Sequence, residues 1–406
     1  MHLRRWITPA FVGLAGAFVV AWDGLLTPAF TDYEREAEPA FDALRAGHLD
    51  SFLAHAPAYG GSLILRAPFV LASHLLGGGG LAAFRAAALP CVLAGLVLGL
   101  YLWGRVRGRG GAYLALGLAA FNPITLRALE IGHPEELLGA VFCAGAVLCA
   151  LEDRASWAGA LLGLALANKA WAVIAIGPTL LALEHGRVRA MLVAAGVAGV
   201  VLAPLFLHGG GAVGAAAQGS TSTGPIFQPW QIWWFLGSHG QVVMGNLGPH
   251  VDYRTAPGWI SSLSHPAIAV MGTPLTPALW RLRRPRADAL GLLALLFLLR
   301  CALDPWDIVY YQLPFVMALL VWEVRARGVA PVLTLTTTLA IWVTFDTTTN
   351  HVSPDAQALL YLAWALPLAA GIGLRVFAPA RFAALAEPAN AAFRRRLPSL
   401  AAAVSA

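Results

Sequence analysis

The sequence has 406 residues, of which 58% are hydrophobic and only 12% are charged, and its formal net charge is +6. A water-soluble domain needs more charged residues to cover its surface, so the composition argues against one and indicates a membrane protein. The basic excess does not indicate nucleic-acid binding, because the sequence shows no folded basic surface. The four cysteines lie in apolar stretches without metal-ligand spacing, and we assign them no role.

Long apolar runs predict an all-α, polytopic membrane fold with about 11–12 transmembrane helices in a single domain, residues 1–406. No small-residue cleavage site follows the first run, so we expect it to be an uncleaved first helix that starts from the cytoplasm. The expected spans are residues 7–26, 82–103, 112–126, 136–151, 156–168, 170–183, 190–207, 264–280, 288–303, 308–322, 329–345 and 357–374.

Charge asymmetry predicts how the chain is oriented. Of the 27 basic residues, 19 fall in short loops that alternation of the spans places on one side, together with only 6 of the 21 acidic residues. The positive-inside rule makes that side cytoplasmic, with both termini there. The bias toward arginine, alanine and glycine suggests a GC-rich bacterial genome, so we expect the bacterial plasma (inner) membrane. The long loops 27–81 and 208–263 then face outward, and we expect function there.

The first long loop opens with five acidic residues within eleven positions: Asp32, Glu34, Glu36, Glu38 and Asp42. A carboxylate at the membrane edge can act as a general base toward an acceptor hydroxyl. The alternative is a solvated acidic loop, and the sequence does not rank these acids. Further on, residues 61–76 are apolar but carry Arg66, and topology does not allow them to cross. They are expected to form a juxtamembrane helix on or in the outer leaflet.

The second outward connection reads Gly132-His133-Pro134-Glu135-Glu136. Its spacing does not match a zinc-protease helix, and we expect no metal site. The two glutamates suit a capping role at the N-terminus of the next helix. Alternatively, the loop faces a shared cavity in which His133 and Glu135 contact a substrate.

Lys169 is the only lysine, and it stands where the two short spans 156–168 and 170–183 meet. A break there is expected to lie near the outer face, and broken helices are tolerated where they line a cavity. A charge at membrane depth costs roughly 2.5–3.5 kcal/mol on insertion scales unless it is solvated or paired. Lys169 therefore either extends to the interface or faces a lipid phosphate, a role for which Arg66, Arg127 and Arg300 are rivals.

The second long loop carries an aromatic run, Phe227–Phe235, that includes Trp230, and later His250. Aromatic residues at this position most often form an interfacial belt, but mixed with polar residues they also suit a sugar or lipid headgroup. Tyr310 and Tyr311 follow Asp304-Pro305 and add hydroxyl groups to the same outer face.

Taken together, these features resemble the C-type (GT-C) membrane glycosyltransferases, and within them the actinobacterial mannosyltransferases that use polyprenyl-phosphate sugars. The resemblance rests on Asp32 with Glu36-Ala37, on Gly132-His133-Pro134-Glu135-Glu136-Leu137, on Gly163-Leu164 with Asn168-Lys169, and on Asp304-Pro305 to Tyr311. Two departures stand out. Ala170-Trp171 follows the lysine where that branch has proline, and the second loop reads Gly-His-Pro-Glu in place of Gly-Gln-x-Asn.

The resemblance implies inverting transfer of mannose, or another hexose or pentose, from a polyprenyl-phosphate donor to a lipid, glycan or protein acceptor. Asp32, with Glu36 beside it, would be the base, and cations would stabilise the leaving lipid phosphate. Cofactor, metal and nucleic-acid partners are not expected, and membrane lipids are. The implied site has donor-phosphate residues Lys169, Arg66 and Arg300, and substrate-binding residues His133, Glu135, Trp230, His250, Tyr310 and Tyr311.

The main alternative is a twelve-helix transporter or a lipid or sugar flippase. It predicts two similar halves and charged residues near the middle of the bilayer, and the sequence shows no convincing internal repeat. A non-catalytic scaffold protein is the third reading, and it would tolerate loss of Asp32.

Overall fold

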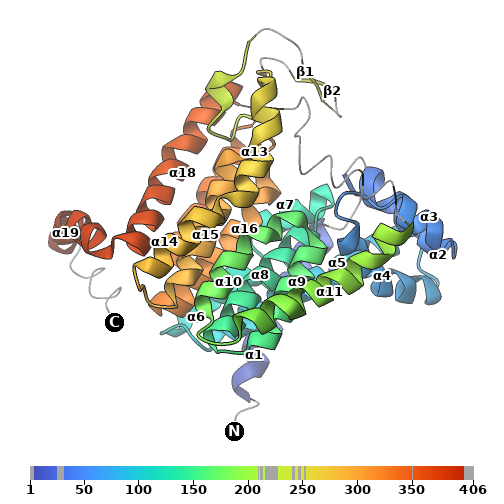
Figure 1. Cartoon of the computed structure of the whole chain (residues 1–406), viewed down its shortest axis with the longest axis horizontal. Helices are drawn as coiled ribbons and strands as arrows, with labels where there is room; N and C mark the ends of the chain where they lie inside the picture. The colour runs from blue at the N-terminus through green and yellow to red at the C-terminus, as the bar shows by residue number, and fades with distance from the viewer. Residues whose placement is uncertain are drawn as a thin grey trace.

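A computed structural model describes residues 4–24, 32–208, 210, 214, 227–239, 243–245, 248–250, 253–349 and 351–396. Most of these residues are helical, as expected for an all-α fold (Figure 1). A small antiparallel sheet of two three-residue strands, β1 (Val243–Gly245) and β2 (Gly248–His250), lies at one end of the molecule.

The first half of the chain supplies most of the predicted site residues. Its elements are α1 (Arg4–Gly24), the π-helical turn η1 (Tyr33–Ala37), α2 (Glu38–Arg45), α3 (Leu49–Ala54), α4 (Gly60–Leu75), α5 (Gly80–Trp103), α6 (Arg109–Ala120), α7 (Pro123–Ile131), α8 (Glu135–Leu151), α9 (Ala155–Asn168), the 3₁₀ turn η2 (Ala170–Ala175), α10 (Ile176–Ala182) and α11 (Arg187–His208).

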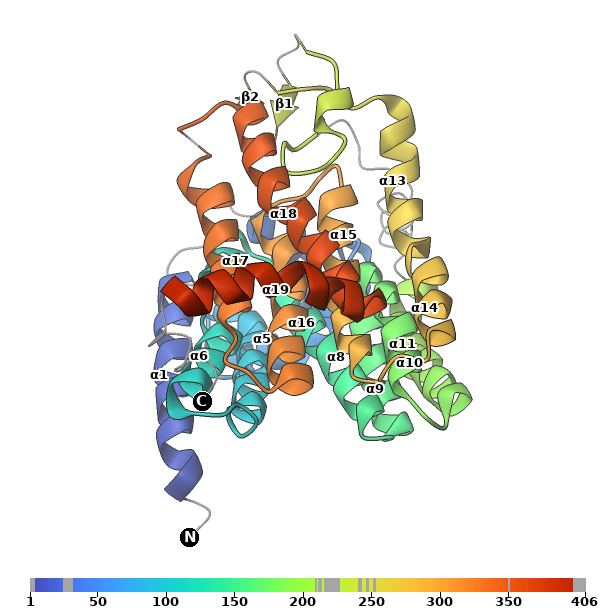
Figure 2. The same cartoon turned by 90° about the vertical axis from the view of Figure 1, so that its left-hand side faces the viewer.

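The second half adds further helices and short turns around the same core. Its elements are the 3₁₀ turn η3 (Trp234–Leu236), the two strands, α13 (Gly258–Val270), α14 (Gly272–Arg281), α15 (Asp288–Leu303), the 3₁₀ turn η4 (Val309–Gln312), α16 (Leu313–Val321), the π-helical turn η5 (Trp322–Ala326), α17 (Val332–Trp342), the π-helical turn η6 (Val343–Thr347), α18 (Pro354–Phe377) and α19 (Pro379–Arg396). Helix α19 crosses the bundle at a steep angle to α18 (Figure 2).

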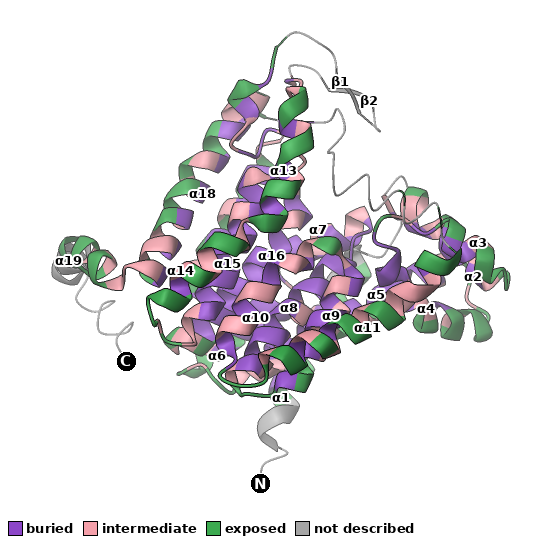
Figure 3. Ribbon diagram, in the orientation of Figure 1, coloured by how far each residue is buried: buried purple, intermediate pink, exposed green. Residues whose placement is uncertain are grey.

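Four helical segments of the described chain are long and apolar enough to cross a membrane: α5, residues 109–131 (α6 with α7), α11 and α18. Large apolar side chains on α11, among them Val188, Leu192, Val200 and Leu207, are exposed (Figure 3). Apolar surface of this extent is typical of a face that contacts lipid, so the chain has the character of a membrane protein. The expected first span coincides with α1, of which residues 8–19 form the apolar part, and the other expected spans coincide with helices that are shorter or broken.

The core is formed by helices that are apolar on all sides. Every residue of α16 is buried, and so is nearly every residue of α15. A helix that is hydrophobic all round is stable only inside a larger assembly, because it has no face to offer to water. These two helices pack against each other and against α8 (Figure 3), and they fix the position of the first turn of α8.

The break expected at Asn168-Lys169 is present. Helix α9 ends at Asn168, Lys169 has an extended backbone, and the chain continues as η2 and then α10. The helix expected over residues 61–76 is also present, as α4, and it packs with α2 and α5 (Figure 1). Residues 27–31 of the first long loop and much of the second lie outside the described residues.

The aromatic run of the second long loop packs onto α18. The indole nitrogen of Trp234 donates to Asp355 Oδ1 at 2.7 Å, and the Arg254 guanidinium donates to both oxygens of the same carboxylate at 2.9 and 2.8 Å. Phe227 and Trp234 are buried and stacked on each other. This part of the loop is therefore folded against the start of α18. The sequence analysis considered an interfacial belt or a headgroup contact for these aromatic residues and did not predict this packing.

The two ends of the helix bundle carry different sets of polar residues. At one end, Arg105 lies 3.9 Å from Glu152, and Arg286 binds both Asp153 and Glu184 at 2.8 and 3.1 Å. Helices α8 and α15 run from that region to the opposite end, where Glu135 begins α8 and Asp304 follows α15. The arginine-rich turns thus gather at one end, and the predicted site residues around Glu135 lie at the other.

Helices α9 and α11 pack through small residues. A Cβ atom on Gly159 would overlap the carbonyl oxygen of Ala190, and one on Gly163 would lie 2.6 Å from the carbonyl oxygen of Ala194. This small-x-x-x-small pattern allows two backbones to approach closely, which is how helices associate in a lipid environment.

We therefore expect Gly159→Ala to destabilise the protein, because its methyl group has no space between the two backbones. The matched control is Gly196→Ala on α11, where a Cβ meets nothing within 4 Å and where alanine favours the helix by roughly 0.5–1 kcal/mol. Thermal unfolding in detergent should give a lower midpoint for Gly159→Ala and an equal or higher one for Gly196→Ala. Equal midpoints for the two variants would contradict the close packing.

Candidate functional site

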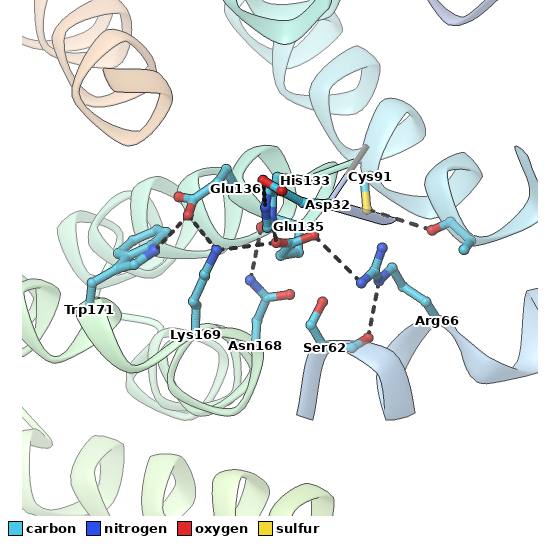
Figure 4. A network of polar contacts seen from close by, with 11 residues as sticks. Asp32, Ser62, Arg66, Cys91, His133, Glu135, Glu136, Asn168, Lys169 and Trp171 are labelled. Carbon is cyan, nitrogen blue, oxygen red and sulfur yellow. Dashed lines mark hydrogen bonds and ion pairs between the residues drawn. The ribbon is translucent and has the colours of Figure 1, made fainter. Parts of the chain in front are cut away.

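The carboxylate of Glu135 is the centre of a buried network of charged residues (Figure 4). Glu135 is the first residue of α8, and its side chain is 0% exposed. Its Oε1 atom lies 2.6 Å from His133 Nδ1 and 3.2 Å from Lys169 Nζ, and its Oε2 atom lies 3.5 Å from a guanidinium nitrogen of Arg66. Three cationic side chains from three different segments thus converge on one carboxylate.

A second carboxylate, Glu136, extends the network. Its Oε1 atom lies 2.7 Å from Lys169 Nζ and accepts a hydrogen bond from the Trp171 indole at 3.3 Å. The guanidinium of Arg300 lies over the rings of Trp171 and Tyr311, at 5.2 and 4.5 Å from their centres. Arg300 also donates to the Tyr311 carbonyl at 3.1 Å. Lys169 therefore bridges the two glutamates, and Trp171 links them to Arg300.

Asp32 closes the network on its more open side. Its Oδ2 atom lies 3.2 Å from His133 Nε2, and its side chain is 32% exposed. The π-helical turn η1 follows Asp32 directly. Because residues four positions apart lie about one turn apart in a helix, Asp32 and Glu36 are carried on the same side. Turns of this π type occur frequently at functional sites.

Backbone geometry explains why two separate loops meet here. Gly132 has a φ of 101°, and a Cβ atom at this position would lie 2.6 Å from the backbone nitrogen of Tyr33. Only glycine combines a favourable positive φ with the absence of a Cβ atom, so Gly132 allows the α7–α8 connection to contact η1. On the other side, the Asn168 side chain donates to the Glu135 carbonyl at 2.9 Å, which ties the end of α9 to the start of α8.

The charges of the site balance. Four carboxylates (Asp32, Glu36, Glu135 and Glu136) face three permanent cations (Lys169, Arg66 and Arg300) and His133. Burial disfavours a charged imidazole, but the Glu135 carboxylate and the hydrogen bonds to Asp32 and Glu135 outweigh it, and the pKa of His133 is raised to about 9. At neutral pH, His133 is therefore the fourth cation.

Several buried polar atoms around the network have no hydrogen-bond partner within the described chain. They are Oε2 of Glu136, Oδ1 of Asn168, a guanidinium nitrogen of Arg66 and the hydroxyl of Ser62. Each such atom costs about 1–3 kcal/mol when it is buried without a partner. A group of them beside paired charges is typical of a site that binds a polar ligand.

The structure brings together most of the predicted site residues. Asp32, Glu36, His133, Glu135, Lys169 and Arg66 lie in the network or directly beside it. The Tyr310 ring stacks on the His133 ring with 4.3 Å between centres, and Tyr311 lies at the Arg300 edge. Lys169 and Arg66 were predicted to bind a donor phosphate. In the structure, each of them is paired with a glutamate.

Of the remaining predicted residues, Trp230 does not join this group. Trp230 is buried and stacks on Phe345 with 4.6 Å between ring centres, and none of its described contacts reaches the network. His250 lies in β2, and its side chain is outside the described residues.

Sequence reasoning did not include Glu136 and Trp171 among the site residues. Glu136 was read as a helix cap, whereas its side chain points into the network, and Trp171 was noted only as a departure from a family pattern. The sequence signal that could have indicated them is the single lysine, Lys169, two residues before Trp171, together with the Glu135-Glu136 pair. The contacts of Lys169 and Trp171 with Glu136 depend on the direction of the chain at the helix break, which the sequence does not predict.

Asp32, Glu36 and His133 also form a group that could hold a metal ion, since one ligand atom from each lies within 4.8 Å of the others. No metal site was expected from the sequence, because the spacing of His133, Glu135 and Glu136 does not match a zinc-protease helix. Two carboxylates and an imidazole suit a divalent cation such as Mn²⁺ or Zn²⁺. Metal binding requires a neutral imidazole, so it would have to displace the proton that His133 holds at neutral pH.

No protein-family model matches the chain, and no curated protein matches it in sequence. The function is therefore argued from the geometry and chemistry of this site.

We expect Lys169→Met to destabilise the fold by about 3–5 kcal/mol, because it leaves two buried carboxylates without their shared partner. The double variant Lys169→Met/Glu136→Gln should recover part of this loss, since it removes one of the unpaired charges. Lys169→Arg keeps the charge and serves as the control. Chemical unfolding in detergent measures all three, and a double variant less stable than Lys169→Met would contradict the pairing.

The raised pKa of His133 predicts a pH dependence of stability. Because the folded-state pKa of about 9 lies above the ordinary value of 6.5, the stabilisation from the charged imidazole is complete below pH 6.5. It is lost as the pH rises through 9. The difference in unfolding midpoint between wild type and His133→Gln should therefore shrink between pH 7 and pH 10. A difference that stays constant over this range would show that His133 is neutral in the folded protein.

Proposed function

We propose that this protein is a polytopic membrane glycosyltransferase that moves a sugar from a polyprenyl-phosphate donor to a hydroxyl acceptor. The observation that carries the proposal is the hydrogen-bonded series Asp32–His133–Glu135 beside Lys169 and Arg66. It places a partly exposed carboxylate next to several cations, and glycosyl transfer from a lipid phosphate needs both a base and a stabiliser of the leaving phosphate.

The proposed topology has 11–12 membrane-crossing helices in a bacterial plasma membrane, with both termini in the cytoplasm. The gathering of Arg105, Arg286 and their acidic partners at one end of the bundle supports this, because cytoplasmic loops are rich in arginine. The site lies at the opposite end and is therefore extracytoplasmic. A polyprenyl-phosphate sugar suits that side, where nucleotide sugars are absent.

In the proposed reaction, Asp32 accepts the proton of the acceptor hydroxyl. The resulting oxygen attacks the anomeric carbon from the face opposite the phosphate, the bond from that carbon to the phosphate oxygen breaks, and the product has inverted configuration. The electron pair of the broken bond stays on the polyprenyl phosphate. His133⁺ holds Asp32 in place, and Glu135 orients His133 through its other ring nitrogen.

The cations of the site are proposed to stabilise the leaving phosphate. Lys169 is shared between Glu135 and Glu136, so its charge is compensated in the resting site. Arg66 keeps one guanidinium nitrogen without a protein partner, and Arg300 has no carboxylate within ion-pair distance among the described residues. These two arginines are the stronger candidates for phosphate contact.

A transporter is the second candidate, and one observation favours it. Glu135, Glu136 and His133 are buried together beside the partly buried Lys169 at a discontinuous helix, as are the ion-coupling residues of many secondary transporters. Here His133 would gain and lose the coupled proton. The two proposals share a site but differ in whether a covalent bond is made.

The test is transfer of radiolabelled mannose from polyprenyl-phosphate mannose to a lipid extract of the native host, with the protein in proteoliposomes. Asp32→Asn should lower the rate by about 10²–10⁴-fold, as expected for loss of a general base. Asp50→Asn is the matched control, because it is the same substitution in the same loop at an exposed position. It should transfer at the wild-type rate.

Other outcomes redirect the assignment. If Glu36→Gln loses transfer while Asp32→Asn keeps it, the base is Glu36. Loss of transfer on chelation, with recovery on adding Mn²⁺, assigns Asp32, Glu36 and His133 to a metal. Absence of transfer from every polyprenyl-phosphate sugar tested, combined with proton-coupled uptake into the same vesicles, contradicts the transferase and supports the transporter.

A further inference from the structure

A second polar feature lies at the arginine-rich end of the bundle, away from the Glu135 network. It is a cavity of about 440 Å³ between the α10–α11 turn and the end of α14 with the α14–α15 turn. Four arginines and one acidic residue line it, and the remaining wall is apolar. The lining residues are Leu181, Leu183, Glu184, Arg187, Leu279, Trp280, Arg283, Arg284, Pro285, Arg286 and Ala289.

Within the described ranges, two of the four arginines are paired with acids and two are not. Arg286 binds Asp153 and Glu184, and Arg284 lies 2.9 Å from Asp288. Arg187 donates to the neutral carbonyls of Leu180 and Leu183, at 2.9 and 2.8 Å, and has no acidic partner within ion-pair distance in the part of the chain that the structure describes. Its positive charge is therefore not compensated.

Arg283 is exposed, and the structure gives it no side-chain hydrogen bond or ion pair among the described residues. Its backbone has a φ of 49°, one residue beyond the cap residue Leu282 of α14, and its amide donates to the Trp280 carbonyl at 2.9 Å. Glycine is the usual residue at this position, because a left-handed conformation costs other residues roughly 1–2 kcal/mol. An arginine here carries that cost and places an unpaired charge at the mouth of the cavity.

The apolar wall of the cavity continues onto surface that suits lipid chains. Trp280 is 60% exposed, and the Arg187 guanidinium lies over its ring at 5.0 Å. Val188 and Leu192, which follow on α11, are 73% and 69% exposed. Tryptophan beside arginine is typical of the interface between lipid chains and headgroups. The cavity therefore joins a cationic part to a lipid-facing helix.

We propose that this cavity binds the headgroup of an anionic glycerophospholipid. The phosphodiester lies between Arg187 and Arg283, the glycerol region contacts Trp280, and one acyl chain follows the exposed apolar face of α11. Basic pockets between membrane helices recognise anionic headgroups by this combination of charge and adjoining apolar surface. The proposal does not depend on the transferase assignment.

The test measures how phosphatidylglycerol raises the thermal unfolding midpoint of the detergent-solubilised full chain. Phosphatidylcholine and inorganic phosphate, each at the same concentration, are the comparison ligands. Wild type should respond to phosphatidylglycerol far more than to either of them. Arg283→Gly should bind phosphatidylglycerol about fivefold more weakly, the effect expected for one arginine near a charged lipid surface. Because glycine relieves the left-handed backbone, the same variant should be at least as stable as wild type without lipid.

Two further variants separate the cavity from a general charge effect. Arg281→Gln removes an exposed charge two residues away, outside the cavity lining, and should keep the wild-type response. Arg283→Lys retains the positive charge and should keep most of the wild-type response to phosphatidylglycerol. The proposal is overturned if Arg283→Gly and Arg281→Gln respond alike. It is also overturned if phosphatidylcholine or inorganic phosphate stabilises wild type as much as phosphatidylglycerol does.

Discussion

The buried carboxylate of Glu135 is the constraint on which the rest of the site depends. A carboxylate with no exposed surface is stable only when cations and hydrogen bonds replace the water it has lost. Here His133, Lys169 and Arg66 do so, and they come from the α7–α8 connection, the α9 break and α4. The positions of these three segments relative to Glu135 are therefore fixed in the folded protein.

That requirement accounts for several otherwise unusual features of the fold. Helix α9 stops at Asn168, because Lys169 needs an extended backbone to reach both glutamates. Arg66, on a mostly apolar helix, is fully buried because its guanidinium contacts Glu135. Gly132 lets the first loop approach so that Asp32 can pair with His133. The result is a preorganised set of charges whose only partly exposed carboxylates are Asp32 and Glu36.

The positions of the helices were largely predictable from the sequence. Which of these helices are long and apolar enough to cross a membrane was predictable only in part. The run expected at 288–303 is α15 to the residue, and the break at 168–169 followed from the shortness of its two flanking runs. Apolar runs of this kind report burial in either protein or lipid. Only four described segments are long and apolar enough to span a bilayer by themselves, and α15 and α16 are apolar because protein surrounds them.

The members of the site were predictable one by one, but their contacts were not. Asp32, His133 and Lys169 each stood out as a charged residue at the end of an apolar run. Asp32 and His133 are about a hundred positions apart, and their contact depends on the φ of Gly132 and on the π-helical turn η1. Neither feature has a sequence signature strong enough to predict, and the burial of Glu135 follows only once three distant segments are placed around it.

We propose that a polyprenyl-phosphate sugar binds at the Glu135 network. Photo-crosslinking tests it most directly, with a polyprenyl phosphate that carries a diazirine at its first isoprene unit. A phosphatidylcholine with a diazirine near its headgroup is the control for general lipid contact. The polyprenyl probe should label residues 32–37, 132–136 and 309–312, and unlabelled polyprenyl phosphate should compete for this labelling. Binding at the Glu135 network would be contradicted if both probes label the same lipid-facing residues on α11 and α18 and unlabelled polyprenyl phosphate does not compete.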